Sequence, residues 1–231
     1  VLKLTKKLKI PYFILGGGSN ILVSDKGFRG MVIKMQNAKI KMQNANKFAL
    51  IQAESGVLTT NLVRYTLNKG LSGLEYFWGL PGTIGGAVHG NAHFKGHFIN
   101  EKVVRIKKID NVIVSVIFKL AVGDKEKLWR KAKEAWEYRR ATQPLDLPSA
   151  GCVFKNPDSH PAGYLIEKCG LKRKKIGGAM ISEKHANFIV NTGRASCKDV
   201  LDLIELCKRK VKEKFGIELV EEIIKVGDFD E

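Results

Sequence analysis

Apolar and polar residues alternate, or gather in short apolar runs, along the first quarter of the chain, which is the pattern of β-strands. An Asp-Lys-Gly turn at residues 25–27 separates the second strand from the third. Further on, two apolar runs follow each other closely, and two short ones lie near the C-terminus. Strands are therefore expected at 11–15, 21–24, 30–35, 48–53, 103–110, 112–120, 188–191 and 217–226.

Four segments instead repeat apolar residues at helical spacing. In the first, 58–69, Leu62, Val63 and Leu67 share a face, and Gly70 stands where a helix C-cap glycine would. The others are a basic helix at 125–140, a short helix at 162–168 and a long one at 198–215. Strand runs interleaved with helices predict an α+β fold. The proline-bounded break at 144–148 is expected to separate two domains.

Composition narrows the class of protein. The 231 residues are 44% hydrophobic and 27% charged, as in ordinary globular proteins, and no apolar run approaches the roughly 20 residues of a membrane span. Residues 1–10 lack the apolar core of a signal peptide. The four cysteines form no C-x-x-C pair, so reduced thiols in a cytoplasm are expected.

The net charge of +17 permits binding of nucleic acid, an anionic membrane or anionic small molecules. However, the lysines are spread along the chain, and no motif of a nucleic-acid-binding module occurs. A solvated lysine-rich surface explains most of this charge. No nucleic-acid or membrane partner is therefore expected.

Two glycine-rich segments are candidate anion-binding loops, because glycine lets backbone N–H groups converge on a phosphate. The first follows a predicted strand, and the second is poor in charge. Each alone could equally be a glycine-rich turn. Their residues are Gly16, Gly17, Gly18, Ser19 and Asn20, and then Pro81, Gly82, Thr83, Ile84, Gly85, Gly86 and Ala87.

Cys152 is a third candidate, between Gly151 and an apolar pair, with Lys155 and Asn156 close behind. A thiol there could be a nucleophile, a proton donor or a packed side chain. Taken alone, the spacing favours packing.

Six segments, in order along the chain, resemble the UDP-N-acetylenolpyruvoylglucosamine reductase family, flavoenzymes that complete UDP-N-acetylmuramic acid for peptidoglycan. They are LGGGSNILVSDKGFRGMVIKM (15–35), GLEYFWGLPGTIGGAVHGNA (73–92), QPLDLPSAGCVFKNP (143–157), AGYLIEKCGLK (162–172), IGGAMISEKHANFIVN (176–191) and FGIELVEEIIKVG (215–227).

The resemblance implies a two-lobed FAD-binding domain of the vanillyl-alcohol-oxidase type followed by an α+β substrate-binding domain, in the shorter subtype of the family. The first domain would span 1–146, with lobes at about 1–36 and 37–146, and the second 147–231. The first glycine segment would hold the FAD pyrophosphate. Residues 81–87 and Asn91 would line the flavin.

The implied chemistry has two half-reactions, in which NADPH reduces FAD and the flavin then passes hydride to the enolpyruvyl group. Cys152 matches the family's proton donor, a position that is usually serine, and Glu222 matches the glutamate that hydrogen-bonds the developing enediolate. Asn156 and His185 match substrate-contacting positions, although His185 could instead be a structural histidine. Strand alternation would point Glu221 away from the site.

This chain departs from the family pattern in three places. It starts at Val1, without a strand and glycine turn that contribute to the FAD site, and His93 replaces a glycine near the flavin. At Asp110 and Asn111 it lacks a segment with a Tyr-Arg motif, whose arginine stabilises the enediolate. Tyr138-Arg139 spells the same dipeptide on the basic helix, but the role is not transferred to it. We expect that segment to belong to the protein, with an intact mass well above 25.7 kDa.

Two other functions remain open. One is a different flavoenzyme of the same superfamily, such as an oxidase, although GCVFKNP and Glu222 belong to the substrate half. The other is a basic module without flavin, which would be colourless and would bind nucleic acid in a salt-dependent way. With the reductase, the expected partners are small molecules, and a monomer is expected.

Overall fold

The computed structural model describes residues 1–36, 38–44 and 47–229, and the chain divides into two compact units. Unit 1 comprises Val1–Gly17 and Gly30–Arg139, and unit 2 comprises Gly18–Arg29 and Arg140–Glu231. The chain therefore changes units within the first glycine segment, between Gly17 and Gly18. No helix within the described ranges is long and apolar enough to cross a membrane.

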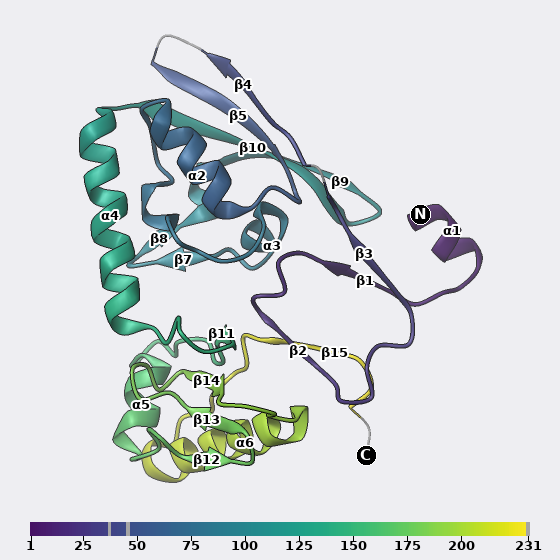
Figure 1. Ribbon diagram of the computed structural model, residues 1–231, viewed down its shortest axis with the longest axis vertical. Helices are drawn as coiled ribbons and strands as arrows, with labels where there is room; N and C mark the ends of the chain where they lie inside the picture. The colour runs from purple at the N-terminus through teal and green to yellow at the C-terminus, as the bar shows by residue number, and fades with distance from the viewer. Residues whose placement is uncertain (37, 45–46, 230–231) are drawn as a thin grey trace. The chain divides into compact units, whose positions relative to one another are not determined.

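Unit 1 combines helices with mainly antiparallel strands (Figure 1). Strands β1 (Tyr12–Leu15) and β3 (Met31–Lys34) form a parallel two-stranded sheet, in which Tyr12 is opposite Met31. The elements are α1 (Leu2–Lys7), β1 (Tyr12–Leu15), β3 (Met31–Lys34), β4 (Ile40–Asn44), β5 (Phe48–Glu54), α2 (Thr59–Asn68), β6 (Leu71–Ser72), the 3₁₀ helix η1 (Glu75–Phe77), α3 (Ile84–His89), β7 (His93–Phe94), β8 (His97–Phe98), the 3₁₀ helix η2 (Ile99–Lys102), β9 (Val103–Ile109), β10 (Val112–Val122) and α4 (Lys125–Thr142).

The core of unit 1 lies on one face of a five-stranded sheet, in which β10 pairs with β5, β6 and β9, and β4 pairs with β5. Phe118 of β10 is opposite Ile51 of β5, and both are fully buried. Lys119, one residue on, points to the other face and is exposed, because side chains alternate along a strand. Leu62 and Leu67 of α2 join this core, and Gly70 follows the helix with φ +65°. The predicted helix, its face and its terminal glycine are confirmed.

Several features of unit 1 differ from the predictions. The short helix α1 and the strand β4 carry no clear periodic pattern, and they were not predicted. The second glycine segment is a loop only as far as Thr83, because α3 begins at Ile84 and includes Gly85 and Gly86. The interpretation of 81–87 as one loop is therefore wrong. A Cβ on Gly85 would lie 2.7 Å from the Ser55 Cβ, so the helix can approach β5 this closely only with glycine there.

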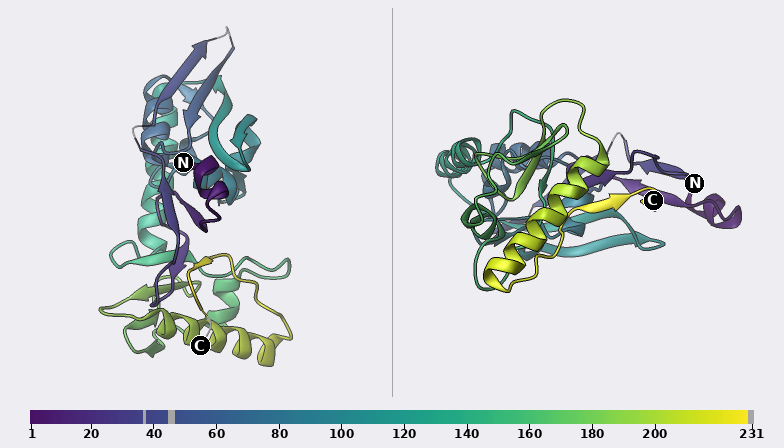
Figure 2. Two further views of the ribbon diagram at one scale, coloured as in Figure 1. Left: turned by 90° about the vertical axis from the view of Figure 1, so that its right-hand side faces the viewer. Right: turned by 90° about the horizontal axis from the view of Figure 1, so that it is seen from below.

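Unit 2 is built on a four-stranded antiparallel sheet of order β11-β14-β13-β12, with α6 packed along it (Figure 2). A separate parallel pair joins β2 to β15, with Ile21 opposite Ile224. The elements are β2 (Ile21–Val23), β11 (Ser149–Cys152), α5 (Ala162–Lys168), β12 (Lys175–Ile176), β13 (Ala179–Ile181), β14 (Phe188–Asn191), α6 (Cys197–Phe215) and β15 (Ile224–Val226).

Helix α6 has well-defined ends. The Ser196 hydroxyl accepts the Asp199 N–H at 3.1 Å, and the Asp199 carboxylate accepts the Ser196 N–H at 3.0 Å, which is a capping box. The Asp25 carboxylate also accepts the N–H of Cys197 at 2.8 Å. Gly216, with φ +69°, ends the helix. The Asp25 turn is thereby fixed to unit 2, which accounts for the place of β2 beside β15.

The last predicted strand is mostly wrong. Only Ile224–Val226 is a strand, and Glu221 makes an isolated bridge to Phe154. The amide of Lys155 donates to the Val220 carbonyl at 2.9 Å, so this stretch pairs with the chain after β11 instead of continuing β15. The α+β character of the fold is confirmed.

Candidate active site

The two glycine segments touch each other within unit 1. A Cβ on Gly17 would lie 2.4 Å from the Gly82 Cα, and one on Gly16 would lie 2.8 Å from the Thr83 hydroxyl oxygen. Real Cβ atoms do not come so close to backbone, so only glycine at position 17 allows the contact with Gly82. Two segments that are 65 positions apart in the sequence, at Gly17 and Gly82, are thus brought together at one place.

Backbone donors are available at the first of these segments. Among the described residues, none accepts a backbone hydrogen bond from the N–H of Gly16, Gly17 or Gly18. At the start of α3, by contrast, the Ile84 and Gly85 amides already donate to Val57 and Ser55, at 2.8 and 2.9 Å. Available N–H groups in a glycine turn suit a phosphate or pyrophosphate, which would supply the missing acceptors. The first segment therefore fits the FAD pyrophosphate.

The side chain of Asn91 is engaged within unit 1. Its Oδ1 accepts the Asn100 N–H at 3.3 Å, and its backbone has φ +46°. The following strands β7 and β8 form a hairpin, in which the His93 ring stacks on Phe98 with centroids 5.2 Å apart. His93 thus serves the packing of this hairpin. A contact between Asn91 and flavin stays a prediction.

Cys152 ends β11 immediately after a β-bulge. Ser149 is opposite Val190 and Cys152 is opposite Phe188, so β11 has one residue more than β14 between these pairs. Gly151 occupies the bulge with φ +79°, a conformation that glycine adopts at little cost. Bulges are common beside active sites because they redirect the next side chain. The half-buried Cys152 is the side chain redirected here.

Glu222 lies next to this segment in unit 2. Its N–H donates to the carbonyl oxygen of Val153 at 2.8 Å, and its own carbonyl accepts the Asn20 side-chain amide at 3.2 Å. The Ile224 N–H donates to the Asn20 carbonyl at 3.0 Å. Backbone bonds on both sides therefore hold Glu222, and the residue after Cys152 is one of its partners.

The neighbouring glutamate has a different environment. The Glu221 carboxylate pairs with Lys208 of α6 and, at 3.0 Å, with Lys225, and its side chain is 17% exposed. Burial raises the pKa of Glu221, but the hydrogen bonds from the two ammonium groups outweigh it and bring the pKa below its usual value. Glu221 is thus an ion-paired residue that is largely covered.

The first glycine segment contributes to both units. A Cβ on Gly151 would lie 3.5 Å from the carbonyl oxygen of Ser19, so Ser19 and Asn20 lie beside the Cys152 and Glu222 segments. Gly16 and Gly17 lie beside Thr83 and Gly82 in unit 1. The sequence assigned all five residues to the cofactor, and it gave no sign of this division.

The two predicted substrate residues also have local partners. Asn156 Oδ1 accepts the Ala162 N–H at 3.0 Å and so caps α5, although the residue is exposed. His185 Nδ1 accepts the Asn187 N–H at 3.3 Å, and its ring meets Phe188 edge to face. Burial, with the charge of Lys172, lowers the pKa of His185, so its imidazole is neutral near pH 7.

The other three cysteines, Cys169, Cys197 and Cys207, lie in packed surroundings. Desolvation raises the pKa of Cys207, inside the unit 2 core, to about 12. Burial also raises the pKa of Cys169 and of Cys197. A raised pKa keeps a thiol protonated and unreactive. In the described part of the chain, no three His, Cys, Asp or Glu residues are grouped so that they could hold a metal ion.

Tyr138 and Arg139 face the β7–β8 hairpin in unit 1. The Arg139 guanidinium lies 4.3 Å from the centroid of Phe94, and the Lys95 ammonium lies 3.4 Å from the centroid of Tyr138. Arg139 is 3% exposed. These contacts attach α4 to the hairpin.

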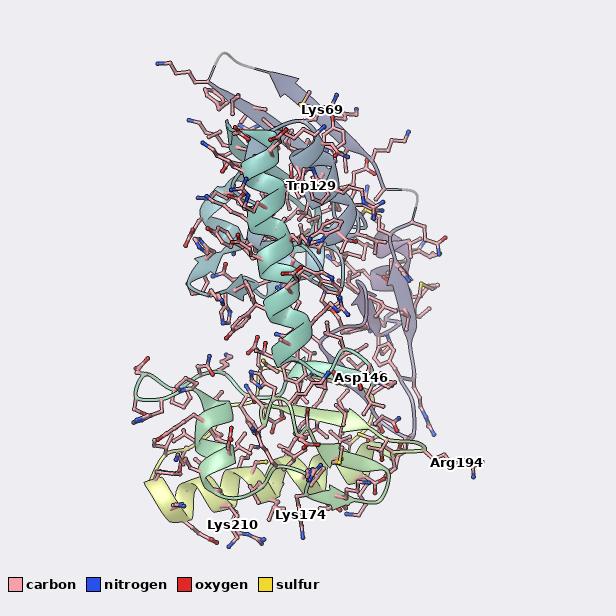
Figure 3. The ribbon with its side chains drawn as sticks, turned by 60° about the vertical axis from the view of Figure 1, so that its left-hand side comes forward. Lys69, Trp129, Asp146, Lys174, Arg194 and Lys210 are labelled. Atoms are coloured by element: carbon pink, nitrogen blue, oxygen red, sulfur yellow. The ribbon has the colours of Figure 1, made fainter. Side chains whose placement is uncertain are left out.

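A hollow of about 430 Å³ opens on α4 in unit 1. Trp129, labelled in Figure 3, meets Trp78 edge to face with centroids 5.3 Å apart. The hollow is lined by Trp78, Trp129, Arg130, Lys133 and Trp136. None of these five residues is among those predicted to hold FAD or substrate.

One buried residue beside the site was not singled out in the sequence. Asn187 is 2% exposed and bonds to the backbone directly after Cys152. The sequence signal that could have identified Asn187 is its place as the one polar residue among the apolar residues of 186–190. A buried amide is usually hydrogen-bonded, so such a residue indicates a backbone group that needs a partner.

Comparison with known proteins gives consistent results for the two parts of the chain. Residues 143–226 match the family model described as UDP-N-acetylenolpyruvoylglucosamine reductase, C-terminal domain. Residues 1–111 match a model described as FAD binding domain.

Relatives named UDP-N-acetylenolpyruvoylglucosamine reductase align along nearly the whole chain. The protein of Caldanaerobacter subterraneus subsp. tengcongensis is 39% identical over 95% of this chain and 80% of its own length. The protein of Caldicellulosiruptor bescii is 41% identical over 100% of this chain and 81% of its own length. The crystal structure of the Thermus caldophilus reductase (MurB) superposes with a TM-score of 0.79 at 31% identity, covering 97% of this chain and 89% of that one.

Proposed function

The chain belongs to the UDP-N-acetylenolpyruvoylglucosamine reductase family, and on that premise we propose that it reduces UDP-N-acetylenolpyruvoylglucosamine to UDP-N-acetylmuramate, with Cys152 as proton donor and NADPH as reductant. As a member of this family it is an FAD-containing oxidoreductase of peptidoglycan precursor synthesis. The observation that carries the proposal is the position of Cys152, after a bulge and one residue from the partner of Glu222.

Bound FAD supplies the hydride once it has been reduced. The N–H groups of Gly16, Gly17 and Gly18 would bind its pyrophosphate, with Ser19 and Asn20 as further donors. Pro81, Gly82, Thr83, Gly85, Gly86 and Ala87, with Asn91, would line the flavin. The close contact of Gly17 with Gly82 supports a shared role for the two segments.

Cys152 would deliver the proton to the α-carbon of the enolpyruvyl group after hydride reaches the methylene carbon. A cysteine thiol has an ordinary pKa of about 8.5, far below that of a serine hydroxyl, so it is a competent acid at neutral pH. Hydride addition leaves negative charge on the α-carbon and its carboxylate, and the transferred proton neutralises it. The resulting thiolate recovers a proton from solvent.

Glu222 would hydrogen-bond the developing enediolate, which requires the carboxyl to be protonated or bridged at that step, because two adjacent anions repel. The backbone bonds of Glu222 to Val153 and Asn20 support a fixed position for it. Asn156 and His185 would contact the substrate. We also propose residues 1–146 as the FAD-binding domain, residues 147–231 as the substrate-binding domain, and a monomeric, cytoplasmic enzyme.

An anaerobic experiment tests this function. The purified protein is reduced with NADPH, UDP-N-acetylenolpyruvoylglucosamine is added, and the flavin absorbance is followed. Reoxidation on adding the substrate is expected. A flavin that is reduced but stays reduced would contradict the proposed acceptor, and a colourless protein that takes up no FAD would contradict the flavoenzyme itself.

A further inference from the structure

Asn187 is a buried amide in the turn that leads into β14. It is 2% exposed, and the Phe188 N–H donates to the His185 carbonyl at 3.0 Å across the same turn. A buried amide in an apolar core costs free energy unless its donors and acceptor are all used. The partners of Asn187 therefore show what the residue is for.

The Asn187 N–H donates to His185 Nδ1, and the other partners of Asn187 are the two residues that follow Cys152. The Phe154 N–H donates to Asn187 Oδ1 at 2.9 Å, and Asn187 Nδ2 donates to the Phe154 carbonyl at 2.8 Å. The Val153 N–H donates to the Asn187 carbonyl at 2.8 Å. Asn187 thus makes three hydrogen bonds to this segment, and its side chain pairs with both polar groups of Phe154 as a strand would.

The same short segment is held from elsewhere by the Glu222 region. The Val153 carbonyl accepts the Glu222 N–H at 2.8 Å, and the Lys155 N–H donates to the Val220 carbonyl at 2.9 Å. Residues 153–155 are thus fixed by Asn187 and by 220–222 together. The pairing of β11 with β14 ends at Cys152. Beyond it, the bonds to Asn187 and to 220–222 take the place of strand-to-strand hydrogen bonds.

We propose that Asn187 is a positioning residue for Cys152, acting through the backbone of Val153 and Phe154. The kinetic part of this inference rests on the proposed function. Proton delivery to carbon requires the thiol at a defined place, and a displacement of about 1 Å can cost on the order of 100-fold in rate. Without the side-chain amide, the buried N–H and carbonyl of Phe154 lose their partners, and the segment that carries Cys152 must move to find others.

Asn187→Ala removes both side-chain bonds. Asn191→Ala is the matched control, since Asn191 ends β14 and its side chain likewise makes two hydrogen bonds to backbone groups, accepting at Oδ1 the amides of Gly193 at 2.9 Å and Ala195 at 3.2 Å. In Asn187→Ala, reoxidation of reduced flavin by substrate is expected to slow about 100-fold, at an unchanged half-saturating substrate concentration. Flavin reduction by NADPH should stay within about twofold in both variants, and reoxidation should be nearly normal in the control.

Alkylation by iodoacetamide, measured peptide by peptide, gives a readout that does not need turnover. The rate for Cys152 should rise about threefold or more in Asn187→Ala, while the rate for Cys169 stays constant. If Asn187→Ala does not fold, Asn187→Asp keeps an acceptor for the Phe154 N–H while losing the donor to its carbonyl, and the same two readouts apply to it.

Equal loss in both half-reactions, the same effect in Asn191→Ala, or an unchanged Cys152 alkylation rate would each overturn the positioning role. Failure of the unmodified protein to reoxidise its flavin would contradict the proposed function instead. The alkylation result would still decide whether Asn187 sets the surroundings of Cys152.

Discussion

The N–H of Glu222 donates a 2.8 Å hydrogen bond to the carbonyl oxygen of Val153, the residue directly after Cys152. The proposed proton donor and the proposed stabiliser of negative charge are thus held by one stretch of backbone. Since each lies within one residue of this bond, a change that displaces either segment is expected to disturb the other.

Replacing Cys152 should separate the two half-reactions. Cys152→Ala is expected to leave flavin reduction by NADPH within about twofold and to slow substrate-driven reoxidation by about 10² to 10⁴, the usual contribution of a general acid. Cys152→Ser should recover part of the loss. Stopped-flow absorbance measures both rates, and Cys169→Ala, which alters a thiol at the end of α5, is the control. Equal slowing of the two half-reactions in Cys152→Ala would argue against proton donation.

Two adjacent glutamates allow a paired comparison. Glu222→Gln is expected to slow reoxidation by about 100-fold, because it removes a group that interacts with developing charge. Glu221→Gln should leave that rate nearly unchanged, since Glu221 is engaged by Lys208 and Lys225. Stopped-flow absorbance of the flavin measures the reoxidation rate of both variants. A larger kinetic loss in Glu221→Gln would reverse the assignment.

Glu221 should instead contribute to stability in a pH-dependent way. Its pKa is lowered in the folded state, despite burial, by the hydrogen bonds from Lys208 and Lys225. The unfolded chain, with a glutamate pKa of about 4.3, therefore binds more protons than the folded chain just below that pH. The contribution is fully present above about pH 4.3 and is lost as the pH falls through the lowered, folded-state pKa.

Glu221→Gln measures this contribution. At pH 7 we expect it to lower the free energy of unfolding by on the order of 1 kcal/mol, as for partly covered ion pairs. The difference from the unmodified protein should shrink on acidification below pH 4. Denaturant unfolding at pH 7 and at pH 3.5 tests this, and a difference that grows towards low pH would contradict the argument.

Much of this fold could be predicted because its determinants are local. The face of α6 made by Leu203, Ile204 and Val211 is visible as a helical repeat, and these residues are buried. The Asp25 turn and the β9–β10 pair also follow from neighbouring residues. The two glycine segments and Cys152 stand out by residue type alone, and the family resemblance then assigned a role to each.

The remaining features depend on contacts between distant positions. Nothing near Ile21 indicates that β2 pairs with β15 some 200 residues later. The bulge at Gly151 exists only relative to the register of β14, and the amide of Asn187 is explained only by Phe154. Local periodicity cannot reveal such relationships, because it reports the face of an element and not its partner.

The contact between the glycine segments predicts a specific loss of cofactor. Gly17→Ala places a Cβ 2.4 Å from the Gly82 Cα, so the two segments must separate. Overpacking of this kind costs about 1 to 3 kcal/mol, which corresponds to FAD binding weakened by roughly 5- to 150-fold. FAD titration measures this. Gly90→Ala, whose Cβ would have an ordinary 3.6 Å contact in the same unit, should bind FAD normally; equal affinities in the two variants would refute a role for the contact.

The short connection between β9 and β10 is the clearest departure of this chain from its relatives. Asp110 and Asn111 have φ of +50° and +68°, as in a type I′ hairpin turn, and Asn and Asp tolerate this conformation well. The alignment to the Caldicellulosiruptor bescii protein spans 261 positions and covers this chain of 231 residues, so about 30 positions (261 − 231) have no counterpart here. The FAD binding domain match ends at residue 111, in this turn.

Residue types that suit the turn favour a direct hairpin between β9 and β10, whereas the family pattern leads to the expectation of a longer segment at this place. Trypsin should then release a peptide that crosses the junction, IDNVIVSVIFK, residues 109–119. Asn111→Gly should keep or slightly raise the free energy of unfolding, and Asn111→Val should lower it by about 1 to 2 kcal/mol, because a β-branched side chain is strained at positive φ. The mass map could instead contain additional residues between Lys108 and Val112, or the Gly and Val variants could be equally stable. Either result would show that the two strands are not joined by this turn. Detection of the junction peptide in an enzyme that still reoxidises its flavin would mean that the reaction proceeds without the arginine of the absent segment.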